Sequence, residues 1–382
     1  MNSLDRVLAA LNLEEPDRIP IGEIGYDLNS ISSVLGIPGN KEITNRRESI
    51  ERGIKILSRF IESLDLDIVP VGPSLPEGGS KIKWIDEETW IDEWGAKYRY
   101  RDGIQWYVGP GLKDPQDIES LEPPDPNAPG MMDGPKILVK KFKGKRALAG
   151  MIPGPKMPYL ARGIDGYNID LFRRPSLAKK FMEMATEYNI ELGKRLIEVG
   201  VDLIVMTGDV AYRGGPIVSV KHFKEVFVPA ISEPARIFHK LGVPMVKHTD
   251  GYLEPIIEDL IGTGIHGLHS IEPTAGMNIR KVKARYGDKI CLWGGVDLSY
   301  TLPLGTKEDV IKEVKERIAS AAPGGGYLLS SSNGYSTAVK FENFKTMVEA
   351  GKKYGRYSTV SYTHLRAHET SLHLVCRLLL EK

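Results

Sequence analysis

The sequence predicts an α/β protein, and more narrowly a (β/α)8 TIM barrel with an antiparallel β insertion between strands two and three. Three observations lead to this prediction. Short apolar runs alternate with longer segments of helical periodicity, which is typical of βαβ units and a parallel sheet. Eight such runs occur, which is the number of strands in a closed parallel barrel. One aromatic-rich stretch interrupts the alternation after the second run.

The candidate strands are apolar and are bounded by glycine, proline or charged residues. They lie at residues 18–25, 66–72, 147–154, 202–209, 243–250, 264–273, 290–297 and 326–333. The main helices between them are expected at residues 176–199, 222–241, 253–263, 279–286 and 307–321. Pro175-Ser176 and Thr306 are typical of helix starts. Gly242, Gly264 and Gly287 are typical of the residues that end helices.

The interrupting stretch, residues 81–109, carries four of the five tryptophans and has turn signals at residues 93–95 and 102–103. This pattern predicts antiparallel ribbons inserted into the barrel. Such an insert could cover the mouth of the barrel. Alternatively, its tryptophans only give a small hairpin a core of its own.

The composition excludes several classes of protein. With 51 basic and 50 acidic residues the net charge is +1, so neither a nucleic-acid footprint nor an acidic tail is indicated. No apolar run approaches the roughly 18 residues of a membrane helix, and the N-terminus lacks the apolar core of a signal peptide. Two cysteines, Cys291 and Cys376, cannot form a disulfide framework. We therefore expect a cytoplasmic protein that binds neither membrane nor nucleic acid.

The C-terminal residues need separate treatment. Residues 360–370 read "VSYTHLRAHET", which closely resembles a translated transposase-type sequencing adapter. We therefore interpret residues 359–382 as an assembly artefact and expect a single barrel domain over residues 1–358. The alternative is a genuine amphipathic tail. The exclusion removes Cys376 and three histidines from any argument about a metal site.

Polar side chains follow the predicted strands where each strand ends. In a barrel of this kind the C-terminal strand ends form the rim at which catalysis occurs. Aspartate and serine at such places also serve as helix caps, so capping or loop bonding competes with catalysis at each acid. The residues at the ends of strands one, four, five, six, seven and eight are Glu23; Asp209; His248 and Asp250; Glu272; Asp297; and Ser331, Ser332 and Asn333.

The pair at the end of strand five is the most informative. In a strand, residues i and i+2 project to the same face, so His248 and Asp250 present an imidazole and a carboxylate side by side. A divalent cation such as zinc accepts both types of ligand. The competing interpretation is an ordinary hydrogen bond in which the carboxylate orients the ring.

Six stretches of the chain resemble the uroporphyrinogen decarboxylase superfamily. Its members are (β/α)8 barrels, and they include the decarboxylase of tetrapyrrole synthesis. They also include zinc-dependent methyltransferases that exchange methyl groups with a cobalt corrinoid on a separate protein. The stretches are "RVLAALNLEEPDRIPI" (6–21), "DEWGAKYRY" (92–100), "GVDLIVMTGDVAYRGGPIVS" (200–219), "HTDGYLEPIIEDLIGTGIHGLHSIEPTAGM" (248–277), "LWGGVD" (292–297) and "PGGGYLLSSSN" (323–333).

Two departures from the family's patterns bear on which branch this chain resembles. The decarboxylases have an arginine-rich "RQAGR"-type segment early in the barrel, whereas residues 22–30 here read "GEIGYDLNS" and hold no arginine. The thiol-methylating branch has His-x-Cys-Gly at strand five and a later cysteine at strand eight. Here His248 matches, Asp250 stands in place of the first cysteine, and residues 331–333 stand in place of the second.

These departures suggest a metal site without thiolates. Histidine and carboxylate ligands are harder than thiolates and leave a metal more Lewis acidic toward oxygen. The resemblance therefore implies a methyltransferase that demethylates a small O- or N-methylated compound. Its partners would be that methylated substrate and a protein carrying a corrinoid, because no Asp-x-His-x-x-Gly segment of the corrinoid-binding type occurs in this chain. A homodimer is compatible with the same observations.

The candidate residues follow from these interpretations. Zinc is the expected metal, and cobalamin or another corrinoid on the partner is the expected second cofactor. Two alternatives stay open: a uroporphyrinogen decarboxylase, and a barrel that binds a ligand or a corrinoid protein without turnover. The expected metal ligands are His248, Asp250 and Glu272; the expected catalytic residues are Glu23, Asp209 and Asp297; and the expected substrate-binding residues are Tyr159, Arg162, Tyr167 and Asn333.

Overall fold

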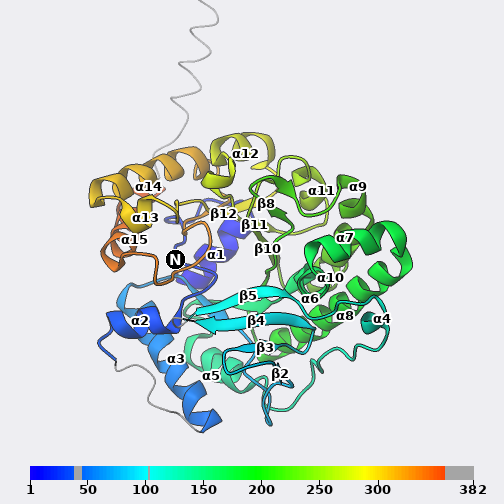
Figure 1. Ribbon diagram of the computed structural model, residues 1–382. Coiled ribbons are helices and arrows are strands. Elements are labelled where there is room, and N and C mark those ends of the chain that lie inside the picture. Colours follow the sequence, from blue (N-terminus) through cyan, green and yellow to red (C-terminus); the bar gives the residue numbers. More distant parts are fainter. Residues whose placement is uncertain (38–44, 102–103, 358–382) are drawn as a thin grey trace, which may run out of the picture.

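A parallel sheet of seven strands curls into a barrel at the centre of the molecule (Figure 1). The computed structural model describes residues 1–37, 45–101 and 104–357. The strands follow one another in the sheet in the order in which they occur in the chain, as βαβ units require. They are β1 (Ile68–Val71), β6 (Ala147–Ile152), β7 (Leu203–Met206), β10 (Met245–Thr249), β11 (Gly267–Ser270), β12 (Cys291–Gly294) and β13 (Tyr327–Leu328).

The first predicted strand, residues 18–25, closes the barrel without forming a regular strand. Ile21 bridges Leu329, just beyond β13, in the parallel sense. On the other side, the backbone N–H of Asp67 donates to the carbonyl of Ile21 at 2.8 Å. The segment therefore occupies the eighth strand position between β1 and β13. Pro20 has no N–H to donate, which limits the ladder that this segment can form.

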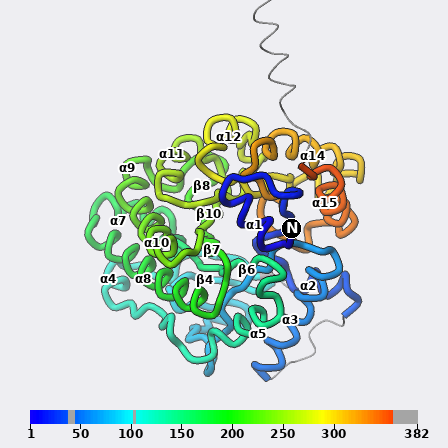
Figure 2. Tube along the Cα trace, turned by 180° about the vertical axis from the view of Figure 1, so that it is seen from behind, coloured from blue at the N-terminus to red at the C-terminus, as the bar shows by residue number. Residues whose placement is uncertain are grey.

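Helices surround the sheet on its outer side, while α1 packs against one end of the barrel (Figure 2). The helical elements are α1 (Ser3–Leu11), α2 (Leu28–Val34), α3 (Arg46–Ser63), α4 (Gln116–Glu119), α5 (Asp133–Phe142), η1 (Gly154–Lys156), α6 (Met157–Arg162), α7 (Ile164–Arg173), α8 (Pro175–Val199), α9 (Val220–His222), η2 (Phe223–Phe227), α10 (Val228–Lys240), α11 (Ile257–Ile261), η3 (Pro273–Ala275), α12 (Ile279–Tyr286), α13 (Thr301–Leu304), α14 (Lys307–Ala321) and α15 (Phe341–Tyr354).

The helix predictions succeed where capping signals are strong. α12 and α14 have the predicted bounds, and α14 begins with a capping box between Thr306 and Asp309. The predicted helix at 222–241 instead divides into α9, a π-helical turn and α10. The predicted helix at 253–263 shortens to α11, which covers only Ile257–Ile261.

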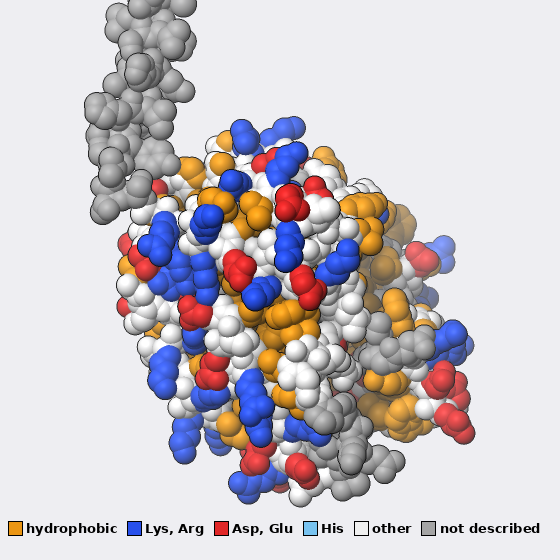
Figure 3. All heavy atoms as spheres, turned by 90° about the vertical axis from the view of Figure 1, so that its left-hand side faces the viewer, with side chains coloured by type: hydrophobic (Ala, Val, Ile, Leu, Met, Phe, Trp, Pro, Cys, Tyr) orange, Lys and Arg blue, Asp and Glu red, His pale blue; other side chains and the backbone are white. Residues whose placement is uncertain are grey.

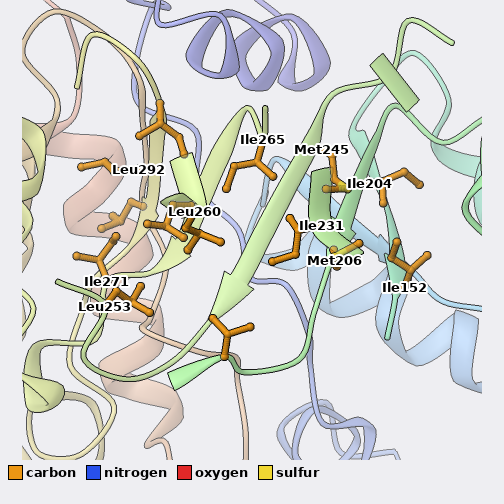
Figure 4. Close-up of a cluster of buried hydrophobic side chains, with 14 of the residues drawn as sticks. Ile152, Ile204, Met206, Ile231, Met245, Leu253, Leu260, Ile265, Ile271 and Leu292 are labelled. Carbon is orange, nitrogen blue, oxygen red and sulfur yellow. The ribbon is translucent and has the colours of Figure 1, made fainter. Parts of the chain in front are cut away.

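Alternation along the strands separates two apolar layers. In β10, Val246 faces the barrel interior together with side chains of α1, whereas Met245 faces the layer between the strands and the outer helices. Figure 4 shows this outer layer, where Ile204 and Met206 of β7 lie near Met245 and near Ile231 of α10. Apolar packing on both sides of the strands therefore holds the polar strand ends in place.

The predicted insertion is present as a four-stranded antiparallel sheet. Trp84 contacts Trp90, which in turn contacts Tyr98, but Trp84 and Trp106 are exposed, so the tryptophans do not form a buried core within the insert. Trp94 instead packs on Phe181 of α8, which joins the insert to the barrel. The strands are β2 (Lys83–Trp84), β3 (Thr89–Ile91), β4 (Ala96–Arg101) and β5 (Ile104–Pro110), and a small separate ribbon comprises β8 (Ala211–Tyr212) and β9 (Gly215–Pro216).

The surface agrees with the balanced composition. Figure 3 shows acidic and basic side chains interspersed over one face of the molecule. Within the described ranges, no helix is both long enough and apolar enough to cross a membrane. The predictions for residues 359–382 and for the turn at 102–103 concern residues outside these ranges.

Candidate functional site

A cavity of about 630 Å³ opens where strand ends of the barrel meet. It lies among the end of β10 and the loops that follow β6, β7, β12 and β13, and the segment at the first strand position contributes to its wall. Its lining combines polar and apolar side chains, as is usual for small-molecule sites. The lining residues are Ile24, Gly25, Met151, Lys156, Thr207, Gly208, Asp209, His248, Leu298, Asn333, Gly334, Tyr335, Ser336 and Ala338.

Three potential metal ligands converge beside this cavity. One ligand atom each from Asp209, His248 and Asp250 lies within 4.8 Å of the others. His248 Nε2 is 3.8 Å from Asp209 Oδ1. A tetrahedral zinc site places ligand atoms about 3.4 Å apart, because its bonds are about 2.1 Å long, so modest side-chain rotation would complete the geometry. The sheet register brings these residues together. Lys247 of β10 pairs with Met206 of β7, so Asp209, which follows β7, lies beside His248 and Asp250 at the end of β10.

A chain of hydrogen bonds behind His248 fixes which ring nitrogen carries the proton. Ser330 Oγ donates to the carbonyl of Ser331 at 2.7 Å, so it accepts from His269 Nε2, which lies 3.2 Å away. His269 Nδ1 is then an acceptor, and it lies 2.8 Å from His248 Nδ1. The proton of neutral His248 therefore sits on Nδ1. Its Nε2 keeps a free lone pair on the side of Asp209, which is the tautomer that a metal ligand requires.

Burial keeps both histidines neutral. Burial lowers the pKa of His248 to about 3, and the nearby Lys247 and Lys156 add to the shift. Burial also lowers the pKa of His269 well below its ordinary value. At neutral pH His248 is thus ready to ligate a cation without first losing a proton.

Asp250 is held in place but keeps one unsatisfied oxygen. Asn333 Nδ2 donates to its Oδ2 at 2.7 Å, and its own backbone N–H donates to Asp209 Oδ1 at 2.9 Å. Its buried Oδ1 has no partner within hydrogen-bond distance among the described residues, although the buried hydroxyl of Ser270 lies close to the Asp250 carboxyl group. Burial and the carboxylate of Asp209 raise the pKa of Asp250 to about 7. Either a bound cation or a small rotation of the Ser270 hydroxyl would satisfy this oxygen.

Lys247 clamps the two strands that carry the candidate ligands. It faces away from the barrel interior, and its Nζ donates to the carbonyls of Thr207 (3.1 Å), Gly208 (2.5 Å) and His248 (2.5 Å). All three ammonium hydrogens are thus used, although burial lowers the pKa of Lys247 to about 7. The clamp fixes the turn before Asp209 against the end of β10.

Close backbone approaches at two turns require glycine. Gly208 has φ +90°, and a Cβ there would lie 2.8 Å from the carbonyl oxygen of Pro153. Gly251 has φ +98°, and a Cβ there would lie 2.5 Å from the backbone nitrogen of Tyr212. Both glycines directly adjoin a candidate ligand, so the loops can bring Asp209 and Asp250 together.

Glu23 lies at the end of the first strand position but is fully buried. The backbone N–H and the hydroxyl of Ser331 donate to its two carboxylate oxygens at 2.8 and 2.7 Å. Burial raises the pKa of Glu23 to about 7, against the effect of these hydrogen bonds. Its neighbours Ile24 and Gly25 line the cavity, whereas Glu23 joins the first segment to the last strand beneath it.

Glu272 and Asp297 stay out of the ligand cluster. The Gly251 N–H and the Thr274 hydroxyl donate to the Glu272 carboxylate at 2.9 and 2.7 Å, so this residue supports the loop after β10. Asp297 accepts from the backbone N–H groups of residues 299–301 and thereby caps the start of α13. The third potential ligand beside His248 and Asp250 is therefore Asp209 and not, as expected, Glu272.

Of the four expected substrate-binding residues, only Asn333 lines the cavity. Tyr159 is buried and donates from its hydroxyl to the carbonyl of Asp209 at 2.6 Å, so it supports the loop of a candidate ligand. Arg162 pairs with Asp170 at 2.7 Å, and the hydroxyl of the fully buried Tyr167 donates to the Ala178 carbonyl at 3.1 Å. Arg162 and Tyr167 thus contribute to packing around the loop after β6.

Three further residues of the site were not singled out from the sequence. The sequence does contain a signal for His269, because it follows apolar residues near the end of the predicted strand at 264–273, as His248 does in the predicted strand at 243–250. Lys247 stands out only as a charge inside an apolar run. Lys156 follows β6 in "GMIPGPKMPYL", where nothing in the local pattern distinguishes it from a surface lysine.

Comparison with known proteins identifies a family that the chain matches. The model of the uroporphyrinogen decarboxylase (URO-D) family matches residues 89–354. A uroporphyrinogen decarboxylase of Pseudoalteromonas atlantica is 23% identical over 384 residues, covering 93% of this chain and 98% of the relative. The methylcobamide:CoM methyltransferase MtbA of Methanosarcina acetivorans is also 23% identical, over 248 residues, covering 64% of this chain and 70% of the relative.

Solved structures agree on the fold. A methyltransferase from Methanosarcina mazei superposes with a TM-score of 0.71 at 21% identity, covering 93% of this chain and 99% of that structure. A B12-independent methionine synthase from Shewanella reaches a TM-score of 0.50 at 13% identity, covering 89% and 94%. The barrel fold is therefore shared with both proteins. Because the family model spans most of the barrel, from the insertion to the last helix, the chain belongs to the uroporphyrinogen decarboxylase family.

Proposed function

We propose that this protein is a methyltransferase that moves a methyl group from a small O- or N-methylated compound to a corrinoid carried by a partner protein. The observation that supports this most is the cluster of Asp209, His248 and Asp250 beside the cavity. The similarity to the methylcobamide:CoM methyltransferase supports the corrinoid partner. The likeness in fold to the Methanosarcina mazei methyltransferase is compatible with it.

The donor set fits a divalent cation, with zinc as the expected metal. One neutral imidazole and two carboxylates supply three ligands, and a fourth position would face the cavity, as in catalytic zinc sites. The unsatisfied Oδ1 of Asp250 and the free lone pair on His248 Nε2 are what such a cation would use. Bound there, the metal would stabilise the negative charge that develops on the substrate heteroatom as its methyl group leaves.

The residues of the chain have defined tasks in this proposal. His248 and the two aspartates hold the cation at one end of the cavity. The amide of Asn333 orients Asp250 from the cavity wall. The apolar part of the lining excludes water from the reacting methyl group. A reduced corrinoid on the partner would supply the electron pair for the new bond to the methyl carbon, and the pair of the broken carbon–heteroatom bond would stay on the heteroatom.

Decarboxylation of a tetrapyrrole is the second candidate, and the relative from Pseudoalteromonas atlantica supports it, because it matches nearly the whole chain. The cavity argues against it. A uroporphyrinogen carries eight carboxylates, whereas Lys156 is the one lysine or arginine among the described residues that line the cavity. Four of the remaining lining residues, among them Ile24, Met151 and Leu298, are aliphatic.

One pair of assays tests the proposal and separates the two candidates. The zinc-loaded protein is incubated anaerobically with cob(I)alamin, as a substitute for the partner's corrinoid, and with methylated aromatic and amine compounds. We expect a methylcobalamin absorbance spectrum to develop with the wild type and with His239→Ala, but not with His248→Ala. In parallel, uroporphyrinogen is offered without metal. Coproporphyrinogen formation without any methyl transfer would overturn the proposal.

A further inference from the structure

One basic side chain, that of Lys156, lines the cavity beside the candidate metal ligands. Lys156 ends η1, directly after β6, and lines the cavity together with Asp209 and His248. It is the only lysine or arginine among the described lining residues. Nothing in the methyl-transfer proposal uses it so far, and its position bears on which substrates the site can accept.

The ammonium of Lys156 has no direct partner. Within the described ranges, no acceptor lies within hydrogen-bond or ion-pair distance of its Nζ. Burial lowers the pKa of Lys156, while the more distant carboxylates of Asp209 and Asp92 raise it. Lys247, by contrast, donates all three of its ammonium hydrogens to backbone carbonyls. Lys156 is half-buried in the cavity wall, and a ligand that supplies an anionic group would give its ammonium a partner there.

Neither nearby carboxylate forms an ion pair with Lys156 in the structure, and each has a role of its own. Asp92 is engaged with the backbone N–H groups of Trp94 and Ala96 at 3.0 and 2.8 Å in the insertion. Asp209 accepts the N–H of Asp250 and belongs to the candidate metal cluster. When a cation neutralises that cluster, Lys156 is the positive group left facing the cavity.

We propose that Lys156 binds a carboxylate on the substrate, so that the protein acts on small methylated compounds that carry one anionic group and an apolar body. This rests on the proposed methyl transfer for the identity of the reacting group. The apolar body would lie against Ile24, Met151 and Leu298, with the carboxylate at Lys156 and the methylated heteroatom at the Asp209–His248–Asp250 cluster. A single lysine suits a monoanion and is too little for a polycarboxylate.

The test compares two probes that differ only in charge, 4-methoxybenzoate and 4-methoxybenzamide. Their binding to zinc-loaded and zinc-free protein is measured by calorimetry, without corrinoid. For the wild type we expect the carboxylate to bind about tenfold or more tightly than the amide. Lys156→Met, which keeps the length of the side chain, should abolish this preference, and Lys156→Arg should largely restore it. Lys136→Met, a change at an exposed lysine of α5, is the matched control and should have no effect.

The outcomes separate this inference from the function on which it rests. An unchanged preference in Lys156→Met, or no binding of either probe to the wild type, would overturn the anion site. If the preference depends on Lys156 but no methyl transfer occurs with any compound, the anion site stands and the proposed function fails. If methylated carboxylates such as 4-methoxybenzoate are demethylated equally well by the wild type and Lys156→Met, the function stands and the inference is wrong.

Discussion

His248 Nδ1 lies 2.8 Å from His269 Nδ1, and the two residues are directly paired across β10 and β11. Because Ser330 accepts from the far nitrogen of His269, the second ring can only accept from the first. His269 therefore acts on a candidate metal ligand from behind, and it fixes both the ring orientation and the tautomer of His248.

The first prediction concerns this positioning role. His269→Phe removes the acceptor for the Nδ1 proton of His248, and zinc affinity should fall about 10- to 100-fold, as is usual when a partner behind a metal ligand is lost. His269→Asn places an amide oxygen near the former Nδ1 and should recover most of the affinity. Competition with a chromophoric chelator measures both, with melting temperatures as the check on folding. Equal zinc affinity in the phenylalanine variant and the wild type would exclude the positioning role.

The second prediction concerns His248 itself. His248→Ala should abolish zinc binding, because two carboxylates rarely hold zinc alone. The matched control is His239→Ala, which changes an exposed histidine whose Nδ1 lies 3.3 Å from His266 Nε2. Titration of the metal-free proteins, followed by calorimetry, gives the comparison. If the wild type binds zinc no more tightly than His248→Ala, the cluster is not a metal site.

The third prediction exchanges the type of ligand at residue 250. Asp250→Cys introduces a thiolate, a softer ligand that zinc binds strongly, so zinc affinity should rise. Asp250→Asn removes the negative charge and should weaken binding. In the wild type, whose Asp250 pKa is about 7, binding should release a proton below neutral pH, and affinity should level off above it. Calorimetry in buffers of different ionisation enthalpy measures the released proton.

The fourth prediction links Glu23 to the pH dependence of stability. Its pKa is raised from 4.5 to about 7 in the folded protein, so the protonated form is favoured by folding. This contribution is fully present below pH 4.5 and is lost as the pH rises toward and past 7. Glu23→Gln, which stays neutral, should therefore become more stable than the wild type as the pH increases, by up to a few kcal/mol. Urea unfolding of metal-free protein from pH 5 to 8 tests this, and parallel pH curves would contradict it.

Much of the fold follows from local sequence patterns. Apolar runs and helical periodicity place most strands and several helices within a few residues of their observed bounds. This is because a strand buried on both faces and a helix buried along one stripe each have a recognisable pattern of apolar residues within the segment itself. The segment at 18–25 shows the limit. Its composition is that of a strand, and Ile21 does bond to both neighbouring segments. Because Pro20 has no N–H to donate, the pairing stays limited to isolated bridges and no regular strand forms.

The location of the site also follows from the sequence, whereas its membership does not. Parallel strands end at one rim, so His248, Asp250 and Asp209 were expected near one another. Which acid completes the cluster depends on loop geometry. Glu272 bonds Gly251 and Asp297 caps a helix, while the turn at Gly208 carries Asp209 to His248.

What the sequence by itself determined is the barrel, the rim and the His-x-Asp pair, since the first two follow from the order of apolar and helical segments along the chain and the third from spacing within one strand. Only the tertiary structure decided the roles of His269, Lys247 and Lys156. His269 reaches His248 through strand register, Lys247 reaches the neighbouring strand through the layer outside the barrel, and Lys156 is left facing a cavity without a partner. The contacts of His269 and Lys247 join residues 21 and 39 positions apart, and the electrostatics of all three residues depends on burial, which no local pattern encodes.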